Sequence, residues 1–220
     1  MNLLEKIHGS RQADHSHSHP APFWVRFYDP IVQFASLGRA KKLHQASLML
    51  AKIQPGESLL DMGCGTGMLI LEAEKIIGPT GAVVGLDVEL EMIAQARRKA
   101  AKAKSRAAFE VASIEHIPYP EASFDVAISS AVIHHLTQAQ IEQGLVELYR
   151  VLKPKGRLLV VDLDLSRRSL ASRLPGHRRL AKQDHVRNQV PGWLQTAGFS
   201  NIKTGKHPFK QLSYAIGEKP

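Results

Sequence analysis

Short apolar segments alternate with amphipathic segments along most of the chain. The apolar segments have the length and aliphatic composition of buried strands, and they are residues 58–62, 82–87, 107–111, 124–129 and 157–162. In the amphipathic segments apolar residues recur at helical spacing, and the predicted helices are residues 37–53, 68–77, 89–104 and 138–152. Strands separated by helices are typical of a parallel sheet that is covered on both faces.

Toward the C-terminus the pattern changes. Residues 166–187 are basic and irregular, and residues 190–197 form a predicted helix that a glycine ends. Two further strands, near residues 201–206 and 211–216, are predicted as a hairpin around Pro208. We therefore predict an α/β fold: a doubly wound, mostly parallel sheet of seven strands with an antiparallel terminal strand.

The chain of 220 residues has the length of one domain. We place this domain at residues 37–220, after a polar tail and aromatic segment at residues 1–36. In the tail, the alternating histidines of His15–His19 fit either a weak metal chelator or a mobile tail without metal, and no further His or Cys pattern completes a tetrahedral metal site. The aromatic side chains between Pro22 and Asp29 either line a substrate entrance or hold the N-terminal segment against the domain.

Cysteine content and hydropathy favour a cytoplasmic location. The single cysteine, Cys64, allows no intrachain disulfide and is typical of a reducing compartment. Charged Glu5 and Lys6 lie where a signal peptide would need an apolar stretch. No apolar run approaches the roughly 18–20 residues that cross a bilayer. We therefore expect a cytoplasmic protein.

The net charge of +9 is concentrated in part between Arg167 and Arg187, where seven basic residues accompany one acidic residue. This segment either attracts an anionic acceptor or an anionic membrane surface that carries a lipid-like one, or it is a solvated basic face. Nucleic acid is a less favoured partner, because few aromatic side chains interleave with the basic ones. The sequence indicates no particular oligomeric state.

A glycine-rich turn follows the first predicted strand. In the sequence LLDMGCGTG, Gly63, Gly65 and Gly67 permit a tight strand-to-helix turn and a close approach of the backbone to a ligand. The dinucleotide fingerprint would need a glycine where Met68 stands, and a phosphate-binding P-loop would need a Gly-Lys-Ser/Thr sequence that does not follow. The turn therefore suits a nucleotide-like ligand but matches neither of these two signatures.

Two carboxylates accompany this turn. Asp61, at the end of the first strand, would repel a pyrophosphate and attract a cationic ligand, unless it serves only to cap the turn. Asp87 ends the second strand, where its carboxylate can accept two hydrogen bonds from a ribose diol. Asp87 suits the ribose of NAD and of S-adenosylmethionine (SAM) equally well and so indicates an adenosine-type ligand without choosing between them. The attraction of Asp61 for positive charge favours SAM, which is cationic at its sulfonium and α-amino groups.

Five segments, in order, resemble motifs of the class I SAM-dependent methyltransferases. Leu59–Gly67 resembles motif I, and Val83–Val88 resembles the acidic second motif. Ile117–Asp125 is similar to the family's LPFPDxSFD stretch, Leu148–Leu158 to its RVLKPGG segment, and Trp193–Phe199 to its L-x-x-A-G-F helix. The similarity is closest to methyltransferase type 11, which includes ubiquinone and menaquinone C-methyltransferases and arsenite methyltransferases. It implies a Rossmann-like methyltransferase fold with SAM as cofactor.

The resemblance also implies a set of cofactor contacts. The methionine part of SAM would lie on the glycine-rich turn with Asp61 near its amino group, while Asp87 would hold the ribose and adenine would pack on Val88 or Met92. At the adenine edge the family often has an Asp-Ala pair, so Ser113 is a departure that loses a carboxylate acceptor. The implied contacts are Asp61, Gly63, Cys64, Gly65, Thr66, Gly67, Asp87, Val88, Met92, Ser113, Ile114 and Ser130.

Methyl transfer from a sulfonium mainly requires alignment of the acceptor with the methyl group, and a base is needed only if the acceptor must lose a proton. The candidate bases lie at strand ends and are His134, His135, Asp162 and Asp164. The alternative is a structural pair for the histidines and a capping role for the aspartates. Arsenite methyltransferases rely on several cysteines, so the single Cys64 argues against arsenic chemistry. The predicted acceptor is a small or lipid-like molecule.

Two other functions share this architecture. An NAD(P)-dependent oxidoreductase would need the glycine that is missing at Met68. A non-catalytic regulatory module would keep the cofactor pocket, and the intact turn with Asp61 and Asp87 argues against it without excluding it. We therefore predict a SAM-dependent methyltransferase.

Overall fold

Seven strands form one sheet in the part of the chain that the structure, a computed structural model, describes: residues 39–163, 188–209 and 212–220. The strands are β1 (Ser58–Met62), β2 (Ala82–Asp87), β3 (Ala108–Val111), β4 (Phe124–Ser130), β5 (Leu152–Leu163), β6 (Ser200–Lys206) and β7 (Leu212–Glu218). The helices are α3 (Ala40–Leu50), α4 (Met68–Ile77), α5 (Leu90–Ala103), the short 3-10 helix η2 (Ile133–His135), α6 (Gln138–Val151) and α7 (Val190–Thr196).

The strand pairing confirms the predicted doubly wound fold. The sheet has the order β3-β2-β1-β4-β5-β7-β6; its first five strands are parallel, and β7 runs antiparallel to both β5 and β6. The chain winds outward from β1 through β2 to β3 and then returns to β4 on the other side of β1. Such a reversal leaves a crevice beside the carboxyl ends of the two central strands, and open α/β sheets bind ligands there.

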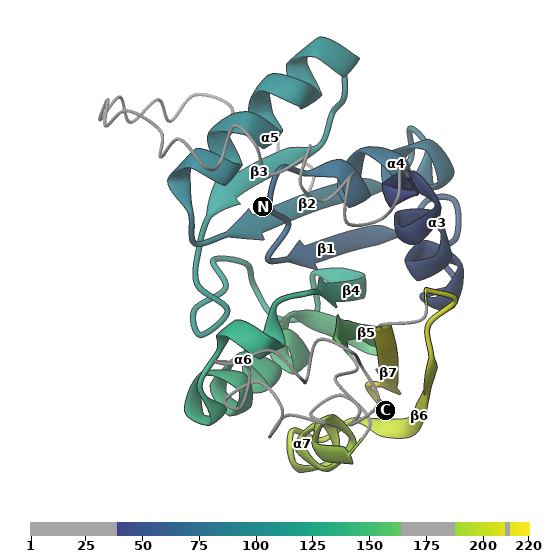
Figure 1. The fold of residues 1–220 in the computed structure, drawn as a ribbon, viewed down its shortest axis with the longest axis vertical. Coiled ribbons are helices and arrows are strands. Elements are labelled where there is room, and N and C mark those ends of the chain that lie inside the picture. The colour runs from purple at the N-terminus through teal and green to yellow at the C-terminus, as the bar shows by residue number, and fades with distance from the viewer. Residues whose placement is uncertain (1–38, 164–187, 210–211) are drawn as a thin grey trace, which may run out of the picture.

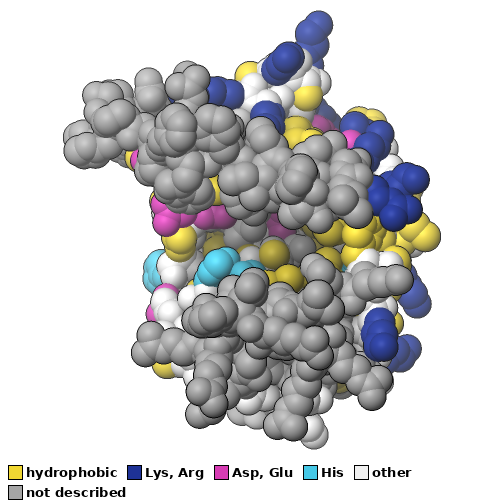
Figure 2. Space-filling view, in the orientation of Figure 1, with side chains coloured by type: hydrophobic (Ala, Val, Ile, Leu, Met, Phe, Trp, Pro, Cys, Tyr) yellow, Lys and Arg dark blue, Asp and Glu magenta, His cyan; other side chains and the backbone are white. Residues whose placement is uncertain are grey.

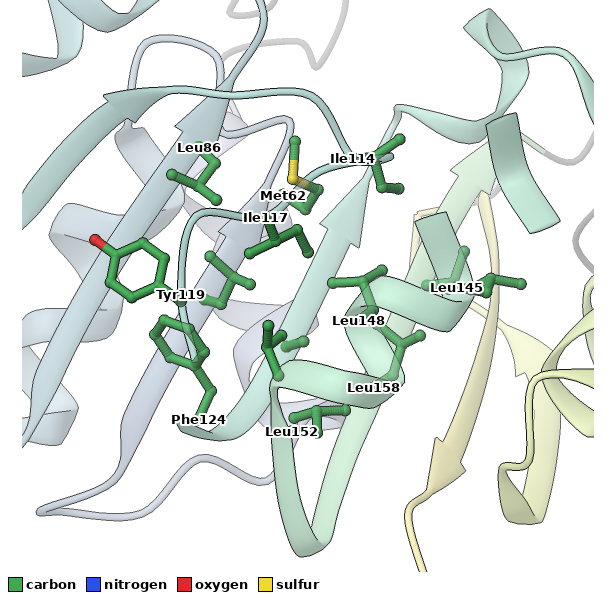
Figure 3. Close-up of a cluster of buried hydrophobic side chains, with 14 of the residues drawn as sticks. Met62, Leu86, Ile114, Ile117, Tyr119, Phe124, Leu145, Leu148, Leu152 and Leu158 are labelled. Atoms are coloured by element: carbon green, nitrogen blue, oxygen red, sulfur yellow. The ribbon is translucent and has the colours of Figure 1, made fainter. Parts of the chain in front are cut away.

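Helices cover both faces of the sheet (Figure 1). Apolar residues of α3, α4 and α5 form one buried cluster with one face, and those of α6 and α7 form a second cluster with the other. Side chains along β1 point alternately to the two faces of the sheet, so Leu59 belongs to the first cluster and Leu60 and Met62 belong to the second. Figure 3 shows the second cluster, in which Tyr119 packs edge-to-face on Phe124 at a centroid distance of 5.1 Å.

The predicted elements agree with the structure within a few residues except at the start of β5. This strand begins at Leu152, in a region predicted as a helix end and a turn, because Leu152 pairs with Phe124 across a register shift. The turn is held by the C-terminal segment: Lys155 N donates to the carbonyl of Lys219 at 2.9 Å, and Lys219 N donates to that of Gly156 at 2.8 Å. These partners are distant in sequence, so local pattern could not reveal the extra pairing.

Several sequence-based hypotheses concern residues outside the described ranges. These are the histidine run His15–His19, the aromatic segment between Pro22 and Asp29, the basic segment Arg167–Arg187 and the candidate base Asp164. Within the described ranges, no helix is both long and apolar enough to cross a bilayer. The same ranges contain no group of three or more His, Cys, Asp or Glu side chains arranged to hold a metal ion.

Candidate active site

A cavity of about 560 Å³ opens beside the carboxyl ends of β1 to β4, at the crevice that the topology predicts. Its wall contains acidic side chains and a histidine, and Figure 2 shows acidic and histidine side chains on opposite sides of a hollow in the surface. The lining residues are Met62, Gly63, Gly65, Asp87, Val88, Glu89, Met92, Ser113, Ile114, Glu115, Ser130, Ala131, Val132, His135, Leu136 and Gln140.

The glycine-rich turn is fixed to the neighbouring strand. The backbone N–H groups of Gly63 and Cys64 both donate to the carbonyl of Leu86, at 2.7 and 2.9 Å. Gly63 has a φ of +79°, a conformation that side chains disfavour, and a Cβ there would lie 2.2 Å from Val132. The turn therefore requires glycine at this position both for its bend and for its contact with the segment after β4.

Asp87 holds the same turn from the end of β2. Its Oδ2 accepts a hydrogen bond from Gly65 N at 2.8 Å, and its Oδ1 accepts one from Glu89 N at 3.0 Å. Each carboxylate oxygen has a further lone pair, so Asp87 on the cavity wall can also accept hydrogen bonds from a ribose diol. The predicted ribose acceptor thus has a second task, which is to orient the turn.

Asp61 lies buried behind the turn. Alternation along β1 places it on the face of Leu59, opposite to Met62, which lines the cavity. Asp61 is 2% exposed, and its Oδ1 has no hydrogen-bond partner among the residues that the structure describes. Burial, and secondarily the charge of Asp87, raises the pKa of Asp61 from 3.8 to about 7. A cationic ligand nearby would stabilise the ionised form of this carboxyl group.

The candidate bases come together at the ends of β4 and β5. His134 Nδ1 lies 2.6 Å from Asp162 Oδ1, and the backbone N–H of His134 donates to Asp162 Oδ2 at 3.1 Å. The rings of His134 and His135 lie 3.9 Å apart between centroids, and His135 lines the cavity. Partial burial, followed by the proximity of His134, lowers the pKa of His135 below 6.5, so its ring is largely uncharged at neutral pH. Of the three, only His135 reaches the cavity.

The structure divides the predicted cofactor residues into two groups. Those on the cavity wall are Gly63, Gly65, Asp87, Val88, Met92, Ser113, Ile114 and Ser130. Those buried behind it are Asp61, Cys64, Thr66 and Gly67. Burial raises the pKa of the Cys64 thiol well above its usual value, which keeps it protonated and a poor ligand for metals or arsenic.

Sequence reasoning missed several residues of the wall, which are Met62, Glu89, Glu115, Ala131, Val132, Leu136 and Gln140. Glu115 could have been found, because it follows two residues after the predicted Ser113. Val132 and Gln140 could not, because only the packing of η2 and α6 beside the glycine-rich turn brings them to the cavity. The capping box of Thr137 and Gln140 indicates where α6 begins but not what it faces.

Comparison with known proteins places this chain in a family. A family model described as a methyltransferase domain matches residues 59–156. Over 195 residues the chain is 31% identical to the 2-phytyl-1,4-naphtoquinone methyltransferase of Synechocystis, and this match covers 86% of the chain and 80% of that protein. The chain belongs to the class I SAM-dependent methyltransferases.

Further similarities agree with this family. The chain is 31% identical over 137 residues to the demethylmenaquinone methyltransferase of Symbiobacterium thermophilum; the match covers 61% of the chain and spans about half, 54%, of that relative. A SAM dependent methyltransferase from Aquifex aeolicus has the same fold, with a TM-score of 0.69 and 22% identity over 80% of this chain and 89% of that one.

The site fits SAM, the cofactor of class I methyltransferases. The buried Oδ1 of Asp61, unpaired among the described residues, suits a ligand with positive charge, and Asp87 has lone pairs for a ribose diol. No lysine or arginine is among the described lining residues, so the wall offers no cation to a pyrophosphate. The turn at Gly63 leaves no room for a side chain between backbone and Val132. These features suit a cationic nucleoside better than a dinucleotide.

Proposed function

We propose that this protein transfers the methyl group of SAM, by in-line displacement, to a small or lipid-like acceptor of the hydroxylated quinone type. One observation carries the proposal: His135, whose partial burial lowers its pKa, lies on the wall of the cavity that fits SAM. The relatives named as naphtoquinone and demethylmenaquinone methyltransferases support the acceptor class.

In this proposal His135 is the base that activates the acceptor. When bound, SAM supplies an electrophilic methyl group on a sulfonium that leaves as a neutral thioether. A hydroquinone-type ring becomes nucleophilic when it loses a hydroxyl proton, and the uncharged imidazole of His135 can take up this proton. His134, bonded to Asp162 at 2.6 Å, is held against the His135 ring and limits its orientation. His134 and Asp162 are then positioning residues.

The remaining wall favours a neutral ring over an anionic acceptor. Asp87, Glu89 and Glu115 line the cavity, and the described part of the lining contains no lysine or arginine to balance them. A phosphate or carboxylate on the acceptor would therefore be repelled. Apolar side chains on the wall, among them Val132 and Leu136, can pack against an aromatic ring.

The experiment is a turnover assay with the full chain, radiolabelled SAM and a panel of acceptors. The panel contains reduced naphthoquinones and benzoquinones with short prenyl tails, their oxidised forms, a phosphoethanolamine and a thiol. We expect label in the reduced quinones alone, because only these have an ionisable ring hydroxyl. Label in the amine or thiol would contradict the acceptor class. Label in none of the acceptors, although SAM is bound, would also contradict it and would favour a non-catalytic module.

A lipid-like acceptor would need access to a membrane, and the basic segment Arg167–Arg187 is our proposal for that contact. Sedimentation with vesicles that contain an anionic phospholipid tests it. We expect binding that falls as salt rises and that falls further when Arg178 and Arg179 are both replaced by glutamine. Equal sedimentation with purely zwitterionic vesicles would show that charge is not responsible.

A further inference from the structure

One wall of the cavity is formed by the segment after β3. Ser113, Ile114 and Glu115 line the cavity there. In the sheet β2 lies between β1 and β3, so a nucleoside with its ribose at Asp87 and its amino-acid part at the turn after β1 directs its base toward this segment. This placement rests on the proposed function, because it takes SAM as the ligand.

Ser113 stands where the related family often has a carboxylate, and its hydroxyl group is already engaged. Its Oγ–H donates to Glu115 Oε2 at 3.0 Å, and its Oγ accepts from Glu115 N at 3.2 Å. A hydroxyl has one hydrogen and two lone pairs, so one neutral lone pair is left for a ligand. That is a weak acceptor for the amino group of a base.

Glu115 is held at the same place by two elements. Its Oε2 accepts from Ser113 and also from Gln140 Nε2, at 3.2 Å, on α6. Gln140 is itself fixed, because its Oε1 accepts from both N and Oγ1 of Thr137 in the capping box of α6. Both bonds to Glu115 end on Oε2, so Oε1 has no hydrogen-bond partner among the described residues. The result is an oriented carboxylate on a cavity wall, and no described residue donates to its Oε1.

We propose that Glu115, oriented by Ser113 and Gln140, is the residue that accepts a hydrogen bond from the 6-amino group of adenine and so selects adenine over a 6-oxo purine. In this arrangement the carboxylate missing at position 113 is supplied two residues later, and Ser113 becomes its support. A 6-oxo base would present a carbonyl oxygen to a carboxylate, and two acceptors repel each other.

The test compares S-adenosylhomocysteine with S-inosylhomocysteine, in which a 6-oxo group replaces the 6-amino group and N1 carries a hydrogen, by calorimetry on the full chain. For the unmodified protein we expect binding of the adenosyl compound to be at least about tenfold tighter, the usual effect of a hydrogen bond to a charged group. Glu115→Gln can rotate its amide to donate to a 6-oxo group, so its preference should fall to within about threefold. Ser113→Ala should give an intermediate preference, because it removes one support of Glu115.

Glu89→Gln is the matched control, since Glu89 is another acidic residue of the wall but lies at the N-cap position of α5 and not in the segment after β3. Its preference for adenine should equal that of the unmodified protein. Should Glu115→Gln keep the full preference while its melting temperature changes, Glu115 is only a structural link to α6 and the inference is wrong. If neither compound binds the unmodified protein, the SAM assignment itself fails, and this outcome is distinct from the first.

Discussion

Asp61 is a buried carboxyl group on β1, two residues before the first glycine of the glycine-rich turn. The desolvation that raises its pKa to about 7 opposes ionisation in the ligand-free protein. Its contribution to stability is thus greatest at low pH and is lost as pH rises from 3.8 through 7. A cationic ligand in the cavity would lower this cost, because positive charge nearby stabilises the ionised carboxyl group.

Binding of SAM should therefore release a proton from Asp61. With a pKa raised to about 7, part of the ligand-free molecules carry this proton at neutral pH, so we expect release of a fraction of a proton per SAM bound. Calorimetry in two buffers with different ionisation enthalpies measures it. Asp61→Asn should bind SAM about tenfold more weakly and release no proton. An equal release from this variant would assign the proton to another group.

His135 offers a second residue-scale prediction, which concerns catalysis alone. Replacing His135 with alanine should lower turnover of a reduced quinone by roughly 10²–10⁴-fold, the usual contribution of a positioned base, and leave S-adenosylhomocysteine binding unchanged. In the unmodified protein turnover should fall as pH drops through the lowered pKa of His135, because only the uncharged ring accepts a proton. Asp162→Asn is the companion variant, and it should lower kcat with little effect on KM. If turnover by His135→Ala keeps the pH dependence of the unmodified protein, His135 is not the base.

At the scale of elements, a buried hydrogen-bond chain joins α3 to the hairpin of β6 and β7. Ser47 Oγ on α3 donates to the carbonyl of Leu43 at 3.2 Å and lies 3.3 Å from His207 Nε2, while Phe209 N donates to His207 Nδ1 at 3.2 Å. This pattern assigns the hydrogen to Nε2 of an uncharged ring. His207 is 3% exposed, and its burial lowers its pKa.

The link between α3 and the hairpin should weaken in acid. The unfolded chain binds a proton at His207 near pH 6.5 and the folded chain only at lower pH, so the free energy of unfolding falls as pH drops from 6.5 through the folded pKa. His207→Gln should lower stability by about 1–2 kcal/mol at pH 8 and flatten this slope. Denaturant titrations at pH 5 and 8 measure both effects, and Ser47→Ala serves as the control that keeps the titrating ring. An unchanged slope in His207→Gln would contradict the assignment.

The boundaries of the elements show how much of the secondary structure can be predicted from the local sequence pattern. Helix α4 was predicted with the bounds that the structure has, because Gly67 at φ +79° and Gly78 at φ +72° are breaks that the sequence displays. The start of β5 was not, because its first residue pairs with Phe124 and its turn is held by Lys219. The end of a helix can be recognised from the residue types at that position, whereas the partner of a strand across the sheet cannot.

For the whole molecule, the cavity lies beside the ends of four strands, so a cofactor bound there should stabilise the domain. A saturating ligand at about 100 times its Kd adds roughly 2.7 kcal/mol, which raises the melting temperature by about 5–11 °C for a chain of this size. We expect this shift with S-adenosylhomocysteine in differential scanning fluorimetry and none with NAD. Asp87→Ala should reduce the shift at the same ligand concentration, because it loses the ribose acceptor and a support of the turn. A shift with NAD alone would contradict the cofactor assignment.

The sequence by itself determined the fold class, the glycine-rich turn and the two acids beside it. These depend on properties of neighbouring residues: hydrophobic period, backbone freedom at glycine and charge at a strand end. Tertiary structure decided which candidates meet. It brought His134 to Asp162 and left only His135 facing the cavity, and it joined Glu115 to Gln140 across two elements. Such contacts arise from the packing of segments far apart in the chain, which no local pattern encodes.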